Sequence, residues 1–422
     1  MQIHKSKCCI IVDHPRRDLP GLTLLAEQLA NEGLEVYLTP MNLQMEEIVR
    51  IQPQLVILTG LRKTTEGMLR FLRSKGLLIC ALETEGGFFF SDEHMLSKFS
   101  NDPELGNLFD YYFSWGEATS RGLRNSLAVK PGQIINTGTP RFDILGDFQE
   151  KQPMQILFNT NFAALEEEEF NKTLGMEIFG FDVLPFHKGL RELRDEYVEL
   201  AKYIEKELNK EVRIVFRPHP FENIDYYREA LKGTSIILNT TGGCEEQIAK
   251  SFLTIQNNCT TGIESVVAGV PTFSISYIST TYRVPAFESV ADFSVSRDEL
   301  LHKIKSVLSG DYLFNVEDKI KNLKFFIHNI DGTSSVELIS KAVLSLQTQL
   351  RKTTFSSNDV KKYSYYYPLR QWVYFIRRGK SPDKRKNWNK SNKAFFHNQL
   401  KIGKGYKISR CKGLLSVKIT KS

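Results

Sequence analysis

Short apolar segments typical of buried strands alternate with helical segments along most of the chain. This alternation constrains the fold strongly, because parallel strands need crossover connections that are usually helices. The expected strands are residues 7–12, 34–38, 54–58, 77–82, 110–115, 133–136, 154–158, 212–216, 235–238, 252–255 and 271–276. A chain of 422 residues is too long for a single core. We therefore predict an α/β protein with two Rossmann-like, doubly wound domains that face each other across a cleft.

The strand expected at residues 212–216 ends in a distinctive loop, Arg217-Pro218-His219-Pro220. Two prolines stiffen this loop and remove backbone donors from it. Ligands of open α/β sheets bind at the carboxyl ends of strands. Arg217 and His219 are therefore candidates to bind a phosphate. The alternative is that His219 only satisfies polar groups of the core.

A second segment, Thr260-Thr261-Gly262, stands directly before an apolar helical run. The amides at a helix start bind anions, and the two hydroxyl groups add donors. Thr261 and Glu264 also have the T-x-x-E spacing of a capping box, so the alternative is that they only cap the helix. Taken together with the Arg217–Pro220 loop, this segment favours a nucleotide site in the second domain.

Two loops of the first domain carry candidate chemistry. Glu83 and Glu85 follow a buried strand and precede Gly86-Gly87. Carboxylates in such a place suit acid–base or nucleophilic catalysis, although a solvated glycine turn is the alternative. Arg16, Arg17 and Asp18 follow the first strand, and we predict that they bind the acceptor.

The last part of the chain differs in composition from the rest. Residues 351–422 contain 20 lysines and arginines against two aspartates, Asp359 and Asp383. Aromatic residues interleaved with cations suit an anionic membrane interface. RNA and a solvated tail without a partner are the alternatives. We favour the membrane and expect no nucleic-acid partner. We also expect a chain truncated near Leu350 to fold and to leave the membrane fraction.

The sequence also allows predictions about where the protein is located in the cell and whether it binds a metal or another cofactor. No apolar run is long enough to cross a bilayer, and no signal peptide opens the sequence. We therefore predict a cytoplasmic protein that is peripheral on the inner face of the cytoplasmic membrane. The six cysteines show no C-x-x-C spacing, and no D-x-D-like motif is evident. We expect neither a metal nor another cofactor.

Eight short motifs occur in an order that resembles the bacterial surface-carbohydrate biosynthesis proteins. They are DHPRRDL (13–19), LETEGG (82–87), FSWGE (113–117), NTGTPRFDIL (136–145), ILFNTNF (156–162), FRPHPFE (216–222), TTGIESVVAGVP (260–271) and DGTSS (331–335). These proteins are similar to GT-B glycosyltransferases that build lipopolysaccharide and capsule. The resemblance spans residues 7–350 and implies the GT-B fold.

Within this wider set, the HP motif and the threonine-rich helix start look like those of CMP-sugar users, the bacterial sialyltransferases and β-Kdo transferases. The resemblance implies that His219 contacts the CMP phosphate and assists departure of CMP. It implies that the turn of Thr260, Thr261 and Gly262 holds the same phosphate, and that Glu264 binds the ribose hydroxyls. Arg217 would neutralise the phosphate or the sugar carboxylate. Glu85 is the expected catalytic carboxylate, with Glu83 as the other candidate.

The predicted function is transfer of an ulosonic acid such as Kdo from a CMP-activated donor to a lipid-linked glycan acceptor, and the resemblance favours retention. The parts are an acceptor and catalytic domain (1–148), a nucleotide-sugar domain (149–330), a closing helix (331–350) and the membrane-associating tail (351–422). The alternatives are a CDP-glycerol-type polyol-phosphate transferase, a UDP-sugar 2-epimerase of the same fold, and a non-enzymatic scaffold.

Overall fold

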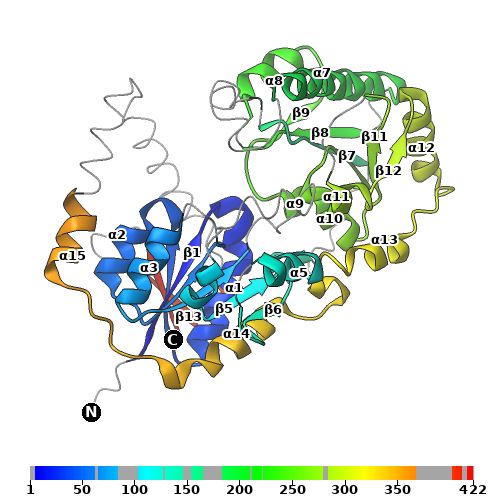
Figure 1. The fold of residues 1–422 in the computed structure, drawn as a ribbon. Helices are drawn as coiled ribbons and strands as arrows, with labels where there is room; N and C mark the ends of the chain where they lie inside the picture. Colours follow the sequence, from blue (N-terminus) through cyan, green and yellow to red (C-terminus); the bar gives the residue numbers. More distant parts are fainter. Residues whose placement is uncertain are drawn as a thin grey trace. The chain divides into compact units, whose positions relative to one another are not determined.

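The structure is a computed structural model in which two compact units can be described (Figure 1). The described residues are 5–61, 65–83, 103–126, 129–145, 154–163, 165, 183–209, 212–220, 222–278, 284–366, 402–410 and 416–421. Unit 1 comprises residues 1–87, 95–144 and 325–422, and unit 2 comprises residues 88–94 and 145–324. The chain thus leaves unit 1, forms unit 2 and returns to unit 1.

Unit 1 is built on one sheet with the strand order β13-β14-β2-β1-β3-β4-β5-β6. Its strands are β1 (Lys7–Val12), β2 (Glu35–Pro40), β3 (Leu55–Leu58), β4 (Leu78–Leu82), β5 (Tyr111–Ser114), β6 (Ile134–Asn136), β13 (Tyr406–Arg410) and β14 (Val417–Lys421). Strands β1 to β6 pair in parallel, whereas β14 runs antiparallel to both β2 and β13. The longer helices are α1 (Pro15–Asn31), α2 (Gln44–Ile51), α3 (Glu66–Ser74), α5 (Glu117–Ser126) and α14 (Ser335–Ser345). Shorter ones are η1 (Met41–Leu43), η3 (Pro103–Leu108), η6 (His328–Asp331), η7 (Gln347–Gln349), α15 (Ser357–Lys361) and η8 (Lys362–Tyr366).

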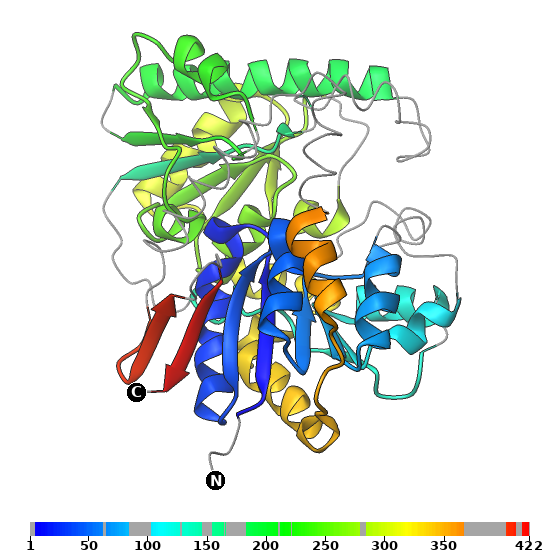
Figure 2. The same cartoon turned by 90° about the vertical axis from the view of Figure 1, so that its left-hand side faces the viewer.

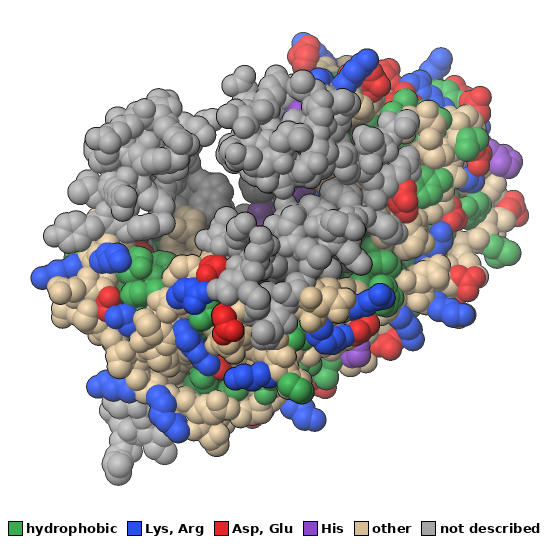
Figure 3. Space-filling view, in the orientation of Figure 1, with side chains coloured by type: hydrophobic (Ala, Val, Ile, Leu, Met, Phe, Trp, Pro, Cys, Tyr) green, Lys and Arg blue, Asp and Glu red, His purple; other side chains and the backbone are tan. Residues whose placement is uncertain are grey.

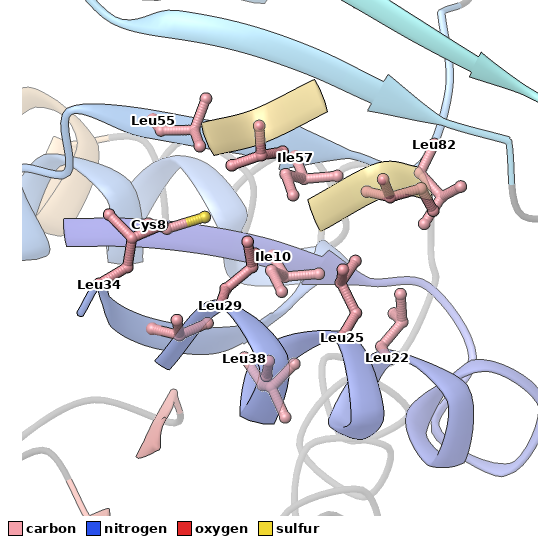
Figure 4. Packing of buried hydrophobic residues seen from close by; sticks show 14 of the residues in the cluster. Cys8, Ile10, Leu22, Leu25, Leu29, Leu34, Leu38, Leu55, Ile57 and Leu82 are labelled. Carbon is pink, nitrogen blue, oxygen red and sulfur yellow. The ribbon is translucent and has the colours of Figure 1, made fainter. Parts of the chain in front are cut away.

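The core of unit 1 lies between the sheet and helices α1 and α14. Leu22, Leu25 and Leu29 recur on α1 at helical spacing and face Ile10 and Leu38 of the sheet (Figure 4). From α14, Val336, Ile339 and Val343 join the same cluster. Burying one such side chain contributes about 1.5–3 kcal/mol to stability. The amphipathic pattern of α1 therefore fixes which face of the helix meets the sheet.

Unit 2 is built on a wholly parallel sheet with the strand order β12-β11-β10-β7-β8-β9. Its strands are β7 (Gln155–Asn159), β8 (Arg213–Arg217), β9 (Ile237–Leu238), β10 (Leu253–Gln256), β11 (Thr272–Ile275) and β12 (Asp292–Ser294). Its helices are α7 (Val183–Glu207), α8 (Ile224–Ala230), α9 (Cys244–Ala249), α10 (Thr260–Val267), α11 (Pro285–Glu288), α12 (Arg297–Ser309) and α13 (Val316–Leu323). Tyr197 and Ile204 of α7 pack on Phe158 and Phe216 of the sheet, and the two phenylalanine rings stack at 5.8 Å between centroids.

Residues near the C-terminal end of the chain belong to unit 1 rather than to a separate tail. Figure 2 shows β13 and β14 lying beside β2 at the edge of the sheet. Val417 and Ile419 of β14 are fully buried in the unit 1 core, and Ser416 donates from its backbone amide to Glu47 at 3.0 Å. The expectation that a chain truncated near Leu350 keeps an intact fold is therefore wrong, because truncation removes part of this core.

Residues 353–366 also pack on unit 1. Lys75 at the end of α3 forms an ion pair with Asp359 of α15 at 2.8 Å, and the ring of Phe71 on α3 lies 5.0 Å from the ring of Tyr363. The backbone amide of Thr354 donates to the carbonyl of Lys75 at 3.0 Å. The basic, aromatic stretch at residues 367–400 lies outside the described residues, but the described segments on both sides of it are anchored to unit 1.

The chain re-enters unit 1 through contacts with the loop after β6. Asp143 accepts hydrogen bonds from the backbone amides of Ser335 and Val336, at 3.0 and 2.9 Å, at the start of α14. The N-cap of this helix is Ser334, whose hydroxyl accepts from the amide of Glu337 at 3.2 Å. The NTGTPRFDIL and DGTSS motifs are thus joined by hydrogen bonds.

None of the described helices is long and apolar enough to span a bilayer.

Candidate functional site

The carboxyl edge of the unit 2 sheet brings together the loops that follow four strands. Strand β8 lies between β7 and β9, and β10 is the other neighbour of β7. All of these strands are parallel, so the loops after them meet at one edge. This edge carries the residues predicted to bind a nucleotide in the second domain.

Arg217 is the last residue of β8, and its guanidinium holds the loop after β9. The side chain is 7% exposed. Nη1 donates to the carbonyl of Thr241 at 3.0 Å and Nη2 donates to that of Gly242 at 2.8 Å. A further hydrogen bond runs to the side-chain oxygen of Asn239. The described contacts therefore give Arg217 a role in shaping the site, and its predicted contact with the donor stays a prediction.

His219 is half-buried on the loop after β8, and its backbone is fixed by Glu222. The His219 amide donates to Oε1 of Glu222 at 2.7 Å, and the Glu222 amide donates to the carbonyl of His219 at 2.9 Å. The Glu222 carboxylate also accepts from the hydroxyl of Thr160, at 3.0 Å to Oε1, and from that of Tyr227. Glu222 was not among the predicted site residues, although it closes the FRPHPFE motif.

Glu222 is a buried carboxylate, with 6% of its surface exposed. Burial raises the pKa of its carboxyl above the usual value, whereas hydrogen bonds from Tyr227, the amides of Phe162 and His219, and Thr160 act in the opposite direction. Burial and the nearby carboxylate likewise raise the pKa of the Tyr227 phenol. The hydrogen bonds of Glu222 thus link the His219 loop to Thr160 after β7 and to Tyr227 of α8.

Helix α10 starts two residues earlier than the capping-box prediction requires, so that prediction is wrong. The N-cap is Cys259, without a side-chain capping bond, and Thr261 lies inside the helix. The hydroxyl oxygen of Thr261 lies 3.5 Å from Sγ of Cys244 and 3.4 Å from Sγ of Cys259. Asn159 contacts the same two thiols, at 3.6 and 3.4 Å. Burial raises the pKa of Cys244 to about 12, so this thiol is protonated at neutral pH.

The other predicted residues of this helix start are close to the sheet edge. Thr260 is half-buried and Gly262 is buried. A Cβ on Gly262 would lie 3.0 Å from Cγ of Gln256, so glycine allows the helix to approach the end of β10. Glu264 is 5% exposed. Contacts of Thr260, Thr261, Gly262 and Glu264 with a nucleotide stay predictions.

Glu245, at the start of α9, is a further carboxylate near this edge. Burial raises the pKa of Glu245, the hydrogen bond with its own backbone lowers it, and the charges of Glu264 and Glu246 raise it again. Glu245 and Glu264 are thus electrostatic neighbours, and the charge of Arg217 acts on Glu245 by lowering its pKa. Carboxylates suit hydroxyl groups rather than phosphates, which fits the ribose role predicted for Glu264.

In unit 1, Glu83 joins the ends of two strands. Its side chain is fully buried, and Oε2 accepts from the hydroxyl of Tyr112 at 2.7 Å. The carbonyl of Glu83 accepts from the indole of Trp115. Glu85 lies outside the described residues. A catalytic role for either glutamate stays a prediction.

Arg17 and Asp18, two of the three predicted acceptor residues after β1, belong to one hydrogen-bond network. Arg17 donates to Asp13 and to Asp18, each at 2.7 Å, and Asp18 accepts from the backbone amide of His14 at 2.9 Å. Asp18 is 2% exposed. The backbone of Arg16 belongs to α1, and its side chain lies outside the described set. Acceptor binding by these residues stays a prediction.

Within the described part of the chain, no three His, Cys, Asp or Glu residues are grouped as a metal site would require.

The overall architecture matches solved structures of enzymes that act on nucleotide sugars or build wall polymers. A proposed UDP-N-acetylglucosamine 2-epimerase from Listeria monocytogenes has a TM-score of 0.52 at 16% identity, over 83% of this chain and 98% of that one. The UDP-GlcNAc 2-epimerase of Methanocaldococcus jannaschii, in complex with UDP-GlcNAc and UDP, has a TM-score of 0.54 at 13% identity, over 80% and 99%. The wall teichoic acid polymerase TagF, as an H548A variant, has a TM-score of 0.55 at 12% identity, over 82% and 90%.

The chain has the GT-B fold. At these identities the similarity establishes the fold alone. No protein-family model and no curated protein sequence matches the chain. The fold prediction is confirmed, and the narrower resemblance to CMP-sugar transferases stays a prediction.

Proposed function

We propose that this chain is a transferase of surface-polymer biosynthesis that binds a nucleotide-activated donor at the carboxyl edge of the unit 2 sheet. One observation carries the proposal: the Arg217–Pro220 loop and the start of α10 follow strands of one parallel sheet in a GT-B protein. Ligands of open α/β sheets bind at this edge. The amides of the helix start and the imidazole of His219 would bind the donor phosphates, while Glu264 would bind the ribose.

The donor is the finer part of the proposal. The sequence motifs favour a CMP-activated ulosonic acid such as Kdo, but the similar structures give more support to the two alternatives. TagF supports a CDP-glycerol-type polyol-phosphate transferase, and the epimerases support a UDP-sugar 2-epimerase. The proline-rich His219 loop and the basic segment favour the transferases, because a hydrolysing epimerase needs no lipid-linked acceptor. We therefore propose a cytidine nucleotide as the donor's activating group.

The proposed chemistry uses preorganised charge. As the bond to the nucleotide breaks, negative charge develops on the departing phosphate, and His219 with the helix amides stabilises it. A carboxylate from unit 1, for which Glu85 is the candidate, activates the acceptor or attacks the donor. The acceptor is a lipid-linked glycan or polymer, bound by Arg16, Arg17 and Asp18.

The first test is stabilisation of the full chain by CMP, CDP, UDP and GDP at equal concentration, measured by thermal unfolding. A ligand that binds only the folded state stabilises it by about 2.7 kcal/mol at a hundredfold excess over Kd. We expect CMP or CDP to raise Tm, and His219→Ala to abolish the shift. The matched control is Arg213→Ala on the exposed end of the same strand, which should keep it.

The outcomes separate the candidate functions. A shift with CMP or CDP favours the two transferases over the epimerase, and it does not separate them from each other because both reactions release CMP. A shift with UDP alone overturns the cytidine assignment and favours the epimerase. If none of the four nucleotides shifts Tm, the cytidine assignment is overturned and the scaffold alternative stands.

We further propose that residues 351–422 attach the enzyme to the inner face of the cytoplasmic membrane. On the face drawn in Figure 3, described cationic side chains are interspersed with acidic ones, so the proposal rests on the composition of this segment. Replacing Arg377, Arg378 and Lys380 by glutamine should weaken binding to vesicles that contain anionic lipid. Replacing the exposed Arg228, Lys232 and Lys305 of unit 2 should not. Added salt should weaken binding by the wild type.

A further inference from the structure

We propose that Glu222 is the positioning residue of the donor site: it fixes the place of His219 and acts on the donor through it. This inference rests on the proposed function, because it assumes that His219 meets the donor phosphates. It adds a residue that the sequence motifs alone did not assign to the site.

Glu222 forms hydrogen bonds with both backbone polar groups of His219. Pro218 and Pro220 have no amide hydrogen, so the amide of His219 is the single backbone donor of the Pro218–Pro220 segment. That donor is used by Oε1 of Glu222 at 2.7 Å, and the Glu222 amide returns a hydrogen bond to the His219 carbonyl at 2.9 Å. The two bonds close a ring that fixes both backbone polar groups of His219.

The other partners of the Glu222 carboxylate tie this ring to separate elements. Thr160 follows β7 and donates its hydroxyl at 3.0 Å, Tyr227 donates from α8, and the amide of Phe162 donates as well. In the structure, each of these groups donates a hydrogen bond to the Glu222 carboxylate. Glu222 thereby sets the position of the loop relative to β7 and α8, and with it the direction of the imidazole.

The substitution Glu222→Gln tests the hydrogen bonding of this side chain without changing its size. It keeps the shape of the side chain, but it replaces one carboxylate oxygen by an amide group and weakens the acceptor that the backbone amides of His219 and Phe162 share. Tyr227→Phe is the matched control, because it removes one donor from Oε2 and leaves the bond from His219 to Oε1. Glu222→Asp keeps the charge and withdraws it by one methylene, and it serves as a second variant if the glutamine variant does not fold.

The first measurement is nucleotide affinity from thermal shifts of the full chain. We expect Glu222→Gln to weaken binding roughly ten- to hundredfold, since small misplacements of a binding group cost that much, and Tyr227→Phe to weaken it far less. Wild-type affinity in Glu222→Gln would overturn the inference and leave the proposed function intact.

The second measurement needs no nucleotide. With 13C-labelled histidine, the Hε1–Cε1 signal of His219 is assigned by its absence in His219→Ala. We expect Glu222→Gln to shift or broaden this signal in the free protein, and Tyr227→Phe to leave it in place. An unchanged signal overturns the positioning role. If no nucleotide binds the wild type but the signal still responds to Glu222→Gln, the proposed function fails, whereas control of His219 by Glu222 is supported.

Discussion

The side-chain amide of Asn329 exchanges two hydrogen bonds with the backbone of Thr139. Oδ1 accepts from the Thr139 amide and Nδ2 donates to its carbonyl, both at 3.1 Å and across 190 positions of sequence. Nδ2 also donates to Asp143 at 2.8 Å. A side-chain amide thus stands in for a β-ladder partner and fixes the loop after β6 to the segment that returns from unit 2.

Asn329→Ala should destabilise unit 1 by about 1–3 kcal/mol, because it leaves the buried amide of Thr139 without this partner, while the carbonyl of Thr139 keeps the hydrogen bond from the Phe142 amide. The free energy of unfolding from urea titration measures the effect. Asn107→Ala is the control, since Asn107 is exposed and its loss should change stability by less than about 0.5 kcal/mol. Equal effects of the two substitutions would contradict a structural role for Asn329.

Gly138 and Gly132 form a natural pair for testing the same contact. Both have positive φ, +71° and +77°. A Cβ on Gly138 would lie 1.8 Å from Oδ1 of Asn329, whereas one on Gly132 would meet nothing within 4 Å. Gly132→Ala should cost about 1–2 kcal/mol from backbone strain alone, and Gly138→Ala about 1–3 kcal/mol more. Indistinguishable urea midpoints for the two variants would show that the loop accommodates a Cβ at position 138 without a measurable loss of stability.

Ile419 of β14 should behave as a core residue although it stands in a lysine-rich segment. Ile419→Ala is expected to cost about 2–5 kcal/mol, because the side chain is fully buried beside β2. Lys407→Ala on the exposed side of β13 is the control and should be nearly neutral. Removal of residues 351–422 should lower the stability of unit 1 severely, so membrane binding is better tested by charge replacement than by truncation.

Docking of α15 on α3 should depend on pH through Asp359. Burial would raise the pKa of Asp359, but Lys75 and the amide and hydroxyl of Ser356 lower it to about 2. The folded value is below the ordinary 3.8, so the ion pair stabilises the docked segment above about pH 4. This contribution is lost as the pH falls from there towards 2. Allowing for solvent screening, it is worth about 0.5–1 kcal/mol.

Hydrogen exchange of the amides in residues 356–361 measures this effect. Protection, corrected for intrinsic exchange rates, should fall between pH 4 and pH 2 in the wild type. Asp359→Asn should already show lowered protection at pH 6 and a flatter pH dependence. Lys75→Met should resemble it, because it removes the other half of the pair. The same pH dependence in all three proteins would rule out the ion pair as its cause.

Much of the fold could be predicted because its strands carry local signals. Every strand expected from the sequence is present, and β1 spans the expected residues. β14 was missed because Val417 and Ile419 alternate with Lys418 and Thr420, and the surrounding charge masks a period-two pattern. Helix α10 was expected, but its first turn was placed two residues late, since T-x-x-E spacing does not reveal that Cys259 takes the N-cap.

The site was predicted less completely than the fold for a physical reason. Arg217 and His219 could be placed at a strand end from proline and β-branched residues alone. Their partners could not, because the carbonyls of Thr241 and Gly242 and the carboxylate of Glu222 meet them only through strand order and loop geometry. Hydrogen bonds between a side chain and a distant backbone leave no periodic trace in a sequence.

The return of the chain to unit 1 has a consequence for synthesis on the ribosome. Unit 2 is almost continuous, from residue 145 to residue 324, whereas the unit 1 sheet includes β14, which ends at Lys421. Domains fold as units while the chain emerges. Unit 2 can therefore fold while unit 1 still exposes the edge of β2 and part of its core, so the domain that is translated first is the last to be completed.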